Sequence, residues 1–156
     1  MADPLIFGDK EIEFLKELLR QKVEFMIVGL SAAALQGAPV VTQDIDLWFR
    51  TLPDPGLEKA LKKFDGSYIP PIADNPPMLA GNGVELFDIV VHMHGLGEFD
   101  DEIEHTVKIP LGRMKVLVLN LERIIASKKS AGRTKDKIVL KVLVDALMTI
   151  KEREGE

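Results

Sequence analysis

The chain has 156 residues, a formal net charge of −5 and no cysteine. This length allows one domain with a sizeable core, and the hydrophobic (46%) and charged (29%) fractions are ordinary for a globular protein. Without cysteine there can be no disulfide and no thiolate metal site, and the negative charge argues against an extended nucleic-acid-binding surface. Because no apolar run is long enough to span a membrane and no signal-peptide pattern is present, we expect a cytoplasmic protein without a membrane partner.

The N-terminal third of the chain predicts a helix and then two strands around a second, short helix. Apolar residues at helical spacing indicate a helix over 10–21, with Asp9 as its N-cap. A short apolar run over 24–28 predicts a buried strand. The small residues over 31–36 favour a helix, and the second strand lies within 40–49.

The rest of the chain also contains segments with helical periodicity and segments with strand periodicity. Four of the nine prolines fall within 67–82, which predicts a long irregular loop with at most short strand pieces. The acidic segment 98–104 predicts one helical turn, and Asn120 is placed to cap the helix that follows. The remaining predicted elements are helices over 57–64, 121–130 and 135–151, and strands over 84–91, 106–109 and 113–118. The chain is therefore of the α/β class.

Two aspartates on the second predicted strand are candidates for a functional site. Asp44 and Asp46 are separated by one residue, so their side chains point to the same face. Two adjacent carboxylates at the edge of a core are costly unless a cation lies between them. Mg2+ typically takes one or two carboxylates plus substrate phosphates, so the pair suggests a metal site. A solvated pair that caps a turn is the alternative, and the pair alone does not decide.

A third carboxylate, Asp88, interrupts the apolar strand over 84–91. Because aspartate is poorly suited to strands, this position favours a site over an edge-strand salt bridge. By alternation His92 and His94 share its face; we expect them at a solvent-exposed strand end, with a metal or acceptor contact as the alternative. Trp48 shares the face of the aspartate pair, and we expect it to pack in the core.

The first strand ends in the turn Gly29-Leu30-Ser31, which leads into the short helix. A helix N-terminus after a glycine turn offers backbone N–H groups and a positive dipole end to phosphates, and a hydroxyl there can bond a phosphate oxygen. The sequence also has one dense positive cluster, which fits either a triphosphate or acceptor site or a solvated helix face. Its members are Lys128, Lys129, Arg133, Lys135 and Lys137.

The order of these features resembles the DNA polymerase beta-like nucleotidyltransferase superfamily, in which a Gly-Gly or Gly-Ser turn precedes an Asp-x-Asp pair and a later carboxylate. The stretch VGLSAAALQGAPVVTQDID is similar to the small stand-alone prokaryotic members, including the AbiEii toxin type. The matching positions are Gly29, Ala32, Gly37, Thr42, Asp44 and Asp46. A second stretch, LNLERIIASKKSAGRTKD, is similar to a family helix that ends in a Lys and an R-x-K-D element. Its matching positions are Lys128, Arg133, Lys135 and Asp136.

The resemblance implies an α/β (α+β) nucleotidyltransferase-like domain over 1–156: a small mixed, twisted sheet with helices packed mainly on one side, and C-terminal helices over about 120–151 packed on it. It implies metal-dependent transfer of a nucleoside monophosphate from an NTP to an unknown acceptor, with Mg2+ or Mn2+ as cofactor. The residues implied for catalysis and metal binding are Asp44, Asp46 and Asp88. Those implied for holding the nucleotide are Gly29, Ser31, Lys128 and Lys135.

Two departures from the family pattern keep a second function open. Leu30 stands in place of the second glycine of the turn, and Val40 stands in place of an arginine that often precedes the aspartate pair. These changes leave the metal ligands intact but alter the nucleotide or acceptor contacts. The alternative is a catalytically inactive nucleotide- or metal-binding module, or a toxin–antitoxin-type partner-binding module, with the same fold. Whether the acceptor is a protein, an RNA or a small molecule stays open, as does a homodimer.

Overall fold

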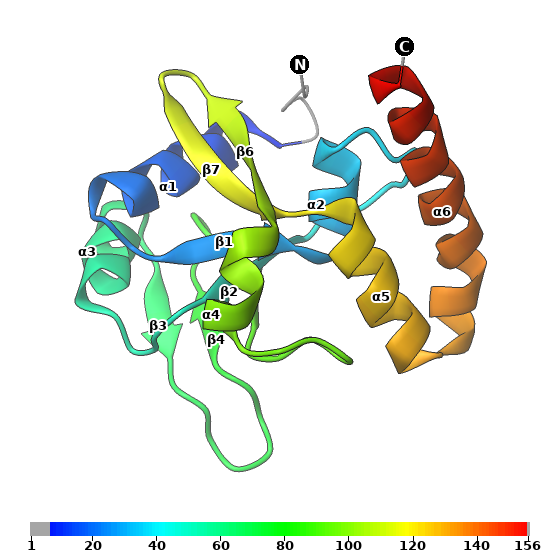
Figure 1. Ribbon diagram of the computed structural model, residues 1–156. Coiled ribbons are helices and arrows are strands. Elements are labelled where there is room, and N and C mark those ends of the chain that lie inside the picture. The colour runs from blue at the N-terminus through cyan, green and yellow to red at the C-terminus, as the bar shows by residue number, and fades with distance from the viewer. Residues whose placement is uncertain (1–6, 156) are drawn as a thin grey trace.

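The structure, a computed structural model, describes residues 7–155 (Figure 1). Helices and strands are interspersed along the chain, as the changes of periodicity predict. The helices are α1 (Asp9–Arg20), α2 (Gly29–Leu35), α3 (Pro55–Lys63), α4 (Phe99–Glu102), the 3-10 turn Ile103–His105, α5 (Leu121–Ala131) and α6 (Thr134–Glu154). The strands are β1 (Phe25–Val28), β2 (Ile45–Phe49), β3 (Ser67–Ile69), β4 (Met78–Ala80), β5 (Phe87–Val90), β6 (Thr106–Leu111) and β7 (Met114–Leu119).

Five strands form one mixed sheet in the order β5-β2-β1-β7-β6, and β3 pairs with β4 in a separate hairpin. Strand β1 runs antiparallel to β2 and parallel to β7, while β2 runs parallel to β5. Strands β6 and β7 form an antiparallel hairpin. In the β2–β5 register Asp46 lies opposite Asp88. The predicted mixed sheet is confirmed, and its topology brings together two carboxylates that are distant in sequence.

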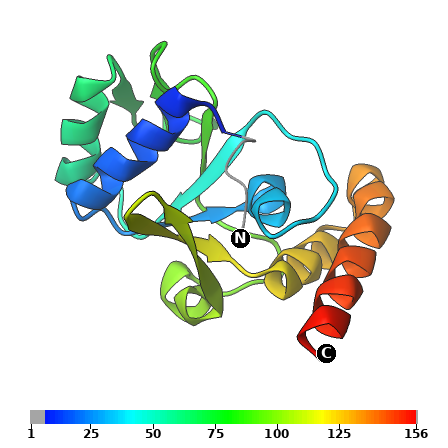
Figure 2. The same cartoon turned by 90° about the horizontal axis from the view of Figure 1, so that it is seen from above.

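Helices α1 and α3 pack on one face of this sheet, and the short helix α4 packs on the opposite face (Figure 2). Phe14 of α1 packs against Phe87 of β5 with ring centroids 4.9 Å apart, and α3 lies beside α1. On the opposite face, Phe99 of α4 meets Trp48 of β2 edge-on at 5.9 Å between centroids. Trp48 is buried, so its predicted packing in the core is confirmed. Because residues two apart on a strand share a face, the face covered by α4 is also the one that carries Asp46.

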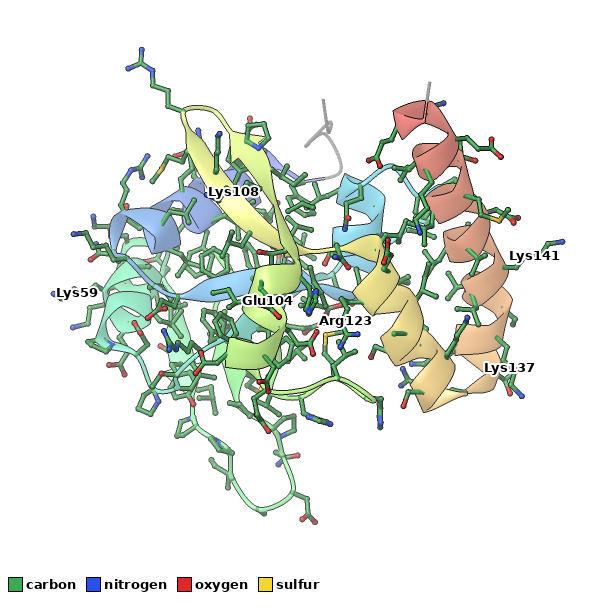
Figure 3. The ribbon with its side chains drawn as sticks, in the orientation of Figure 1. Lys59, Glu104, Lys108, Arg123, Lys137 and Lys141 are labelled. Carbon is green, nitrogen blue, oxygen red and sulfur yellow. The ribbon has the colours of Figure 1, made fainter. Side chains whose placement is uncertain are left out.

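Helix α5 is fixed in front of the sheet by two polar interactions. The Asn120 side chain accepts a hydrogen bond from the Arg123 backbone N–H at 2.9 Å, which confirms the predicted cap. The Arg123 guanidinium donates to Glu102 of α4 at 2.7 and 2.8 Å, where α4 approaches α5 (Figure 3). Glu102 is buried, and the guanidinium lowers its pKa. This bidentate pair therefore ties α4 to α5 with charge-assisted hydrogen bonds.

Several predicted boundaries differ from the structure, two of them for a clear physical reason. Gly8 is the N-cap of α1, and Asp9 lies inside the first turn, where its carboxylate complements the helix dipole. The strand predicted over 84–91 is shorter because a turn, closed by the Phe87 N–H to the Val84 carbonyl at 3.1 Å, occupies its start. The proline-rich segment 67–82 contains the two three-residue strands β3 and β4, in agreement with the predicted loop with short strand pieces. Within residues 7–155 there is no helix whose length and apolarity would allow it to cross a membrane.

Candidate active site

The three predicted carboxylates lie on or directly before the adjacent strands β2 and β5. Asp46 on β2 and Asp88 on β5 are direct register partners, and Asp44 lies one residue before β2 begins. Asp46 is half-buried, whereas Asp44 and Asp88 are exposed. Strand pairing therefore brings Asp46 next to Asp88. Asp44 lies outside β2, so the predicted shared face of Asp44 and Asp46 stays a prediction.

The electrostatics of this group show mutual repulsion. Burial raises the pKa of Asp46 to about 6, with further contributions from the Asp88 and Asp44 carboxylates, while Lys128 acts in the opposite direction. The pKa of Asp88 is also raised, first by burial and then by Asp44. Crowded carboxylates of this kind are stabilised by a cation between them. Oxygen donors are also the ligands that Mg2+ and Mn2+ prefer, so the residues present fit the predicted cofactor.

The arrangement is not a preformed ligand cage. In the part of the chain that the structure describes, no three His, Asp or Glu side chains are grouped closely enough to hold an ion by themselves. Asp46 lines one cavity, Asp88 lines a second, and Asp44 lines neither of these two. A cation held by these carboxylates would take its remaining ligands from substrate phosphates or water, as Mg2+ commonly does.

The turn after β1 sets the position of Asp46. The Ser31 hydroxyl is buried; it donates to the Val28 carbonyl at 2.8 Å and accepts from the Asp46 backbone N–H at 3.1 Å. Gly29 has φ +67°, and a Cβ built on it would overlap the Asp46 carboxylate oxygen Oδ2. The structure thus gives Ser31 a role in positioning Asp46, and its predicted phosphate contact stays a prediction.

We expect Gly29→Ala to damage the site through this contact. The added methyl group collides with the Asp46 carboxylate, and an L-residue at this φ costs about 1 kcal/mol in addition. Binding of ATP·Mg2+, measured by isothermal titration calorimetry, should weaken about tenfold or more. Gly37→Ala is the matched control, since Gly37 has φ +97° but its Cβ would meet no atom within 4 Å. Equal losses of binding in the two variants would contradict a specific role for Gly29.

A cavity of about 160 Å³ lies beside Asp46 and carries the cations of the site. It is built from the end of β1, the segment after β5, and the C-terminal half of α5 with the turn into α6. Besides Gly29 and Asp46, its polar lining residues are His92, His94, Ser127, Lys128 and Arg133. The two histidines are exposed, as expected, but they border this cavity with ring centroids 6.4 Å apart.

Asp136 holds the two cations of this cavity in place. Its carboxylate is 1% exposed and accepts from Arg133 Nε at 2.6 Å and from Arg133 Nη2 at 3.2 Å. Lys128 Nζ lies 3.3 Å from the other side of the carboxylate, at Oδ1. Hydrogen bonds from Arg133 and then Lys128 lower the pKa of Asp136 to about 2 against the opposing effect of burial. Asp136 is therefore an ionised, buried bridge between α5 and the start of α6.

The structure divides the basic cluster predicted from the sequence. Lys128 and Arg133 line the cavity, while Lys135 is exposed and does not line it. Lys137 projects outward from α6, as does Lys141 (Figure 3). Arg133 was predicted only as a member of this basic cluster and as a matching position of the resemblance, and Asp136 only as a matching position, so neither was predicted to hold the nucleotide. Their signal was the capping pattern at the start of α6, in which the Arg133 backbone N–H donates to Asp136 at 3.2 Å.

Comparison with known proteins identifies the fold. No protein-family profile and no curated protein matches the sequence. Among solved structures, a proposed nucleotidyltransferase from Thermotoga maritima (TM1012) matches with a TM-score of 0.60 and 20% identity, over 93% of this chain and 96% of that chain. The solution structure of the antibiotic-resistance factor ANT(2'')-Ia matches with a TM-score of 0.58 and 15% identity, over 96% and 95%.

A crystal structure of ANT(2'')-Ia in complex with adenylyl-2''-tobramycin also matches, with a TM-score of 0.56 and 17% identity over 90% of this chain and 91% of that chain. The mixed sheet and its helices are thus those of the nucleotidyltransferase fold. The fold class predicted from the sequence resemblance is confirmed.

Proposed function

We propose that this protein is a metal-dependent nucleotidyltransferase that transfers a nucleoside monophosphate from an NTP to an acceptor. The observation that supports the proposal is that a pair of carboxylates lies next to a cavity with cationic side chains. Asp46 and Asp88 repel each other on adjacent strands, and a cavity containing Lys128 and Arg133 opens beside Asp46. Paired carboxylates for a cation, next to cations for phosphates, are the requirements of phosphoryl transfer.

The residues have distinct proposed roles. Asp46 and Asp88, with Asp44 beside them, would hold Mg2+ or Mn2+. When bound, the cation neutralises phosphate charge and orients the reacting oxygens. Lys128 and Arg133 attract the triphosphate, and their shared bond to Asp136 keeps both side chains at the cavity. The nucleotide contacts predicted for Gly29, Ser31 and Lys135 remain part of this proposal.

The alternative, an inactive module with the same fold, rests on Leu30 and Val40. Neither of these residues is among those that line the cavity beside Asp46 within the described chain. Neither departure therefore lies in the wall of this cavity, which supports the catalytic function over the inactive module.

Incubation with α-labelled NTPs and Mg2+ or Mn2+ tests the proposal. We expect metal-dependent transfer of label by the wild-type protein and loss of transfer in Asp44→Asn, because this change removes one charge from the carboxylate group. Asp65→Asn is the matched control, since Asp65 is exposed in a turn at φ +53°, which asparagine tolerates. Metal-dependent nucleotide binding without transfer would favour the inactive module. Identical behaviour of Asp44→Asn and wild type would contradict the proposal.

A further inference from the structure

A second and larger cavity, of about 530 Å³, lies on the other side of the carboxylates. It is enclosed between the β3–β4 hairpin, whose loop projects from the lower edge of the molecule in Figure 1, and the edge strand β5. Apart from Asn75, Glu85 and Asp88, every residue that lines it is apolar. The cavity is therefore mainly apolar, and Asp88, a carboxylate of the candidate active site, forms part of its wall.

The apolar side chains of this cavity are unusually exposed. Ile72 is 61% exposed and Met78 is 52% exposed, and both line the cavity. Large apolar side chains gathered at one place on a surface indicate a binding site. Pro70, Pro76 and Pro77 also line it, and their fixed φ angles limit the conformations of the loop. The site is therefore preorganised, which lowers the entropy cost of binding a ligand.

The two cavities differ sharply in charge. The cavity beside Asp46 contains Lys128 and Arg133, whereas the described residues that line the larger cavity include no Lys, Arg or His. The larger cavity has instead the carboxylates of Asp88 and Glu85, the latter partly offset by Lys10 at 3.8 Å. A triphosphate is attracted to the first cavity, and the second would repel the phosphates of a nucleic acid.

We propose that the larger cavity binds the acceptor and that the acceptor is a small molecule with an apolar body, a hydroxyl group and a preference for positive charge. This inference rests on the proposed function. The volume is within the range of roughly 300–1,000 Å³ typical of small-molecule sites. Because Asp46 and Asp88 are register partners, an acceptor hydroxyl at Asp88 lies next to the carboxylate pair while the triphosphate occupies the opposite side.

The transfer step balances with the NTP as the co-reactant. The acceptor hydroxyl oxygen forms a new bond to the α-phosphorus, and the bond from that phosphorus to the pyrophosphate oxygen breaks. The pyrophosphate leaves with the electron pair of the broken bond, and the hydroxyl proton passes to the Asp88 carboxylate. Attack from one cavity and departure toward the other give the in-line arrangement that phosphoryl transfer needs.

Three probes of similar shape test the inference: phenylalaninol, which carries an ammonium group; N-acetylphenylalaninol, which is neutral; and 3-phenyllactate, which carries a carboxylate. Each is titrated into the full-length 15N-labelled protein in the presence of α,β-methylene-ATP and Mg2+, with NMR chemical shifts as the readout. We expect shifts within 69–79 and 85–89. Phenylalaninol should bind tightest and phenyllactate weakest, with at least about a fivefold difference because of the acidic lining.

Substitutions at the exposed apolar positions of the cavity provide a second test of the inference. Ile72→Asp and Met78→Asp should each weaken the binding of N-acetylphenylalaninol about tenfold, because they place a charge in the apolar wall without disturbing the core. Val41→Asp is the matched control, since Val41 is 94% exposed and does not line the cavity. Binding of α,β-methylene-ATP·Mg2+ near Lys128 should be unchanged in all three variants.

The outcomes separate this inference from the proposed function. If the nucleotide binds but no probe shifts the cavity residues, or probe binding survives both aspartate substitutions, the inference is overturned. Shifts of the same residues by an oligoribonucleotide in place of the probes would also overturn it, since they would indicate a nucleic-acid acceptor. If the probes bind but the nucleotide does not, the proposed function fails and the acceptor role fails with it.

Discussion

Asp46→Asn is expected to lower the rate of nucleotide transfer by at least about 10³-fold, because a metal-binding carboxylate supports several kcal/mol of transition-state stabilisation. The same change is expected to stabilise the metal-free protein. Burial, together with Asp88 and Asp44, raises the pKa of Asp46 to about 6, so the ionised carboxylate destabilises the folded state at neutral pH. Activity and stability should therefore change in opposite directions.

The pH dependence follows from the direction of this shift. A carboxyl group whose pKa is higher in the folded state binds its proton more tightly there, so folding stability falls as pH rises from about 4 through about 6. Replacing Asp46 with asparagine, which does not ionise, removes this loss of folding stability. With allowance for the partial exposure of the side chain, Asp46→Asn should raise the free energy of unfolding by about 1–2 kcal/mol at pH 8 and have little effect at pH 4.

Urea denaturation at pH 4 and pH 8 in the presence of a chelator measures this difference, with Asp65→Asn as the control. Added Mg2+ should stabilise the wild type at pH 8 and have a much smaller effect on the variant, because ligand binding to the folded state shifts the unfolding equilibrium. A variant that is less stable than wild type at pH 8, or that keeps its transfer activity, would show that Asp46 is not the crowded metal ligand proposed here.

Asp136→Asn is expected to have the largest effect on stability. Asp136 is 1% exposed, and its pKa is lowered to about 2 by Arg133 and Lys128. A lowering of about two units corresponds to about 2–3 kcal/mol of folding free energy. The pH dependence of this contribution is opposite to that of Asp46. The stability that Asp136 contributes is present above about pH 4 and is lost as pH falls toward about 2. The difference between wild type and variant in urea denaturation should shrink over that interval.

A functional readout distinguishes positioning from stability alone. Without the Asp136 carboxylate, Lys128 and Arg133 are no longer held at the cavity, so the KM for the NTP should rise about tenfold, with a smaller change in kcat. Asp145→Asn is the matched control because Asp145 is exposed on the same helix. If Asp136→Asn lowers stability but leaves the KM unchanged, the bridge serves only to join α5 to α6.

Much of the candidate site follows from local sequence patterns. The alternation of apolar residues predicts that Asp44 and Asp46 share one face of the second strand and that Asp88 interrupts a later apolar strand, and Gly29 marks the turn that precedes the aspartate pair. The turn residue Asn120 likewise predicts the start of α5. Each of these features depends on a few neighbouring residues.

Other features are decided by contacts between distant segments. The sequence predicts a phosphate contact for the Ser31 hydroxyl, and only the packing against β2 adds its hydrogen bond from the Asp46 backbone N–H. Lys135 and Arg133 are equivalent as charges in a basic cluster, yet only Arg133 lines the cavity, because Asp136 anchors it there. No local pattern encodes such choices, since they depend on which side chains the packing of α5 and α6 brings to the surface.

By itself, the sequence determined the α/β class, the resemblance to nucleotidyltransferases and the three candidate carboxylates. Only the tertiary structure decided that Asp46 and Asp88 are register partners, that Asp136 bridges Lys128 and Arg133, and that a second cavity opens at Asp88. The physical reason is the range of the interactions. Strand and helix periodicity are set within a few residues, whereas strand register, buried ion pairs and cavities arise from long-range packing.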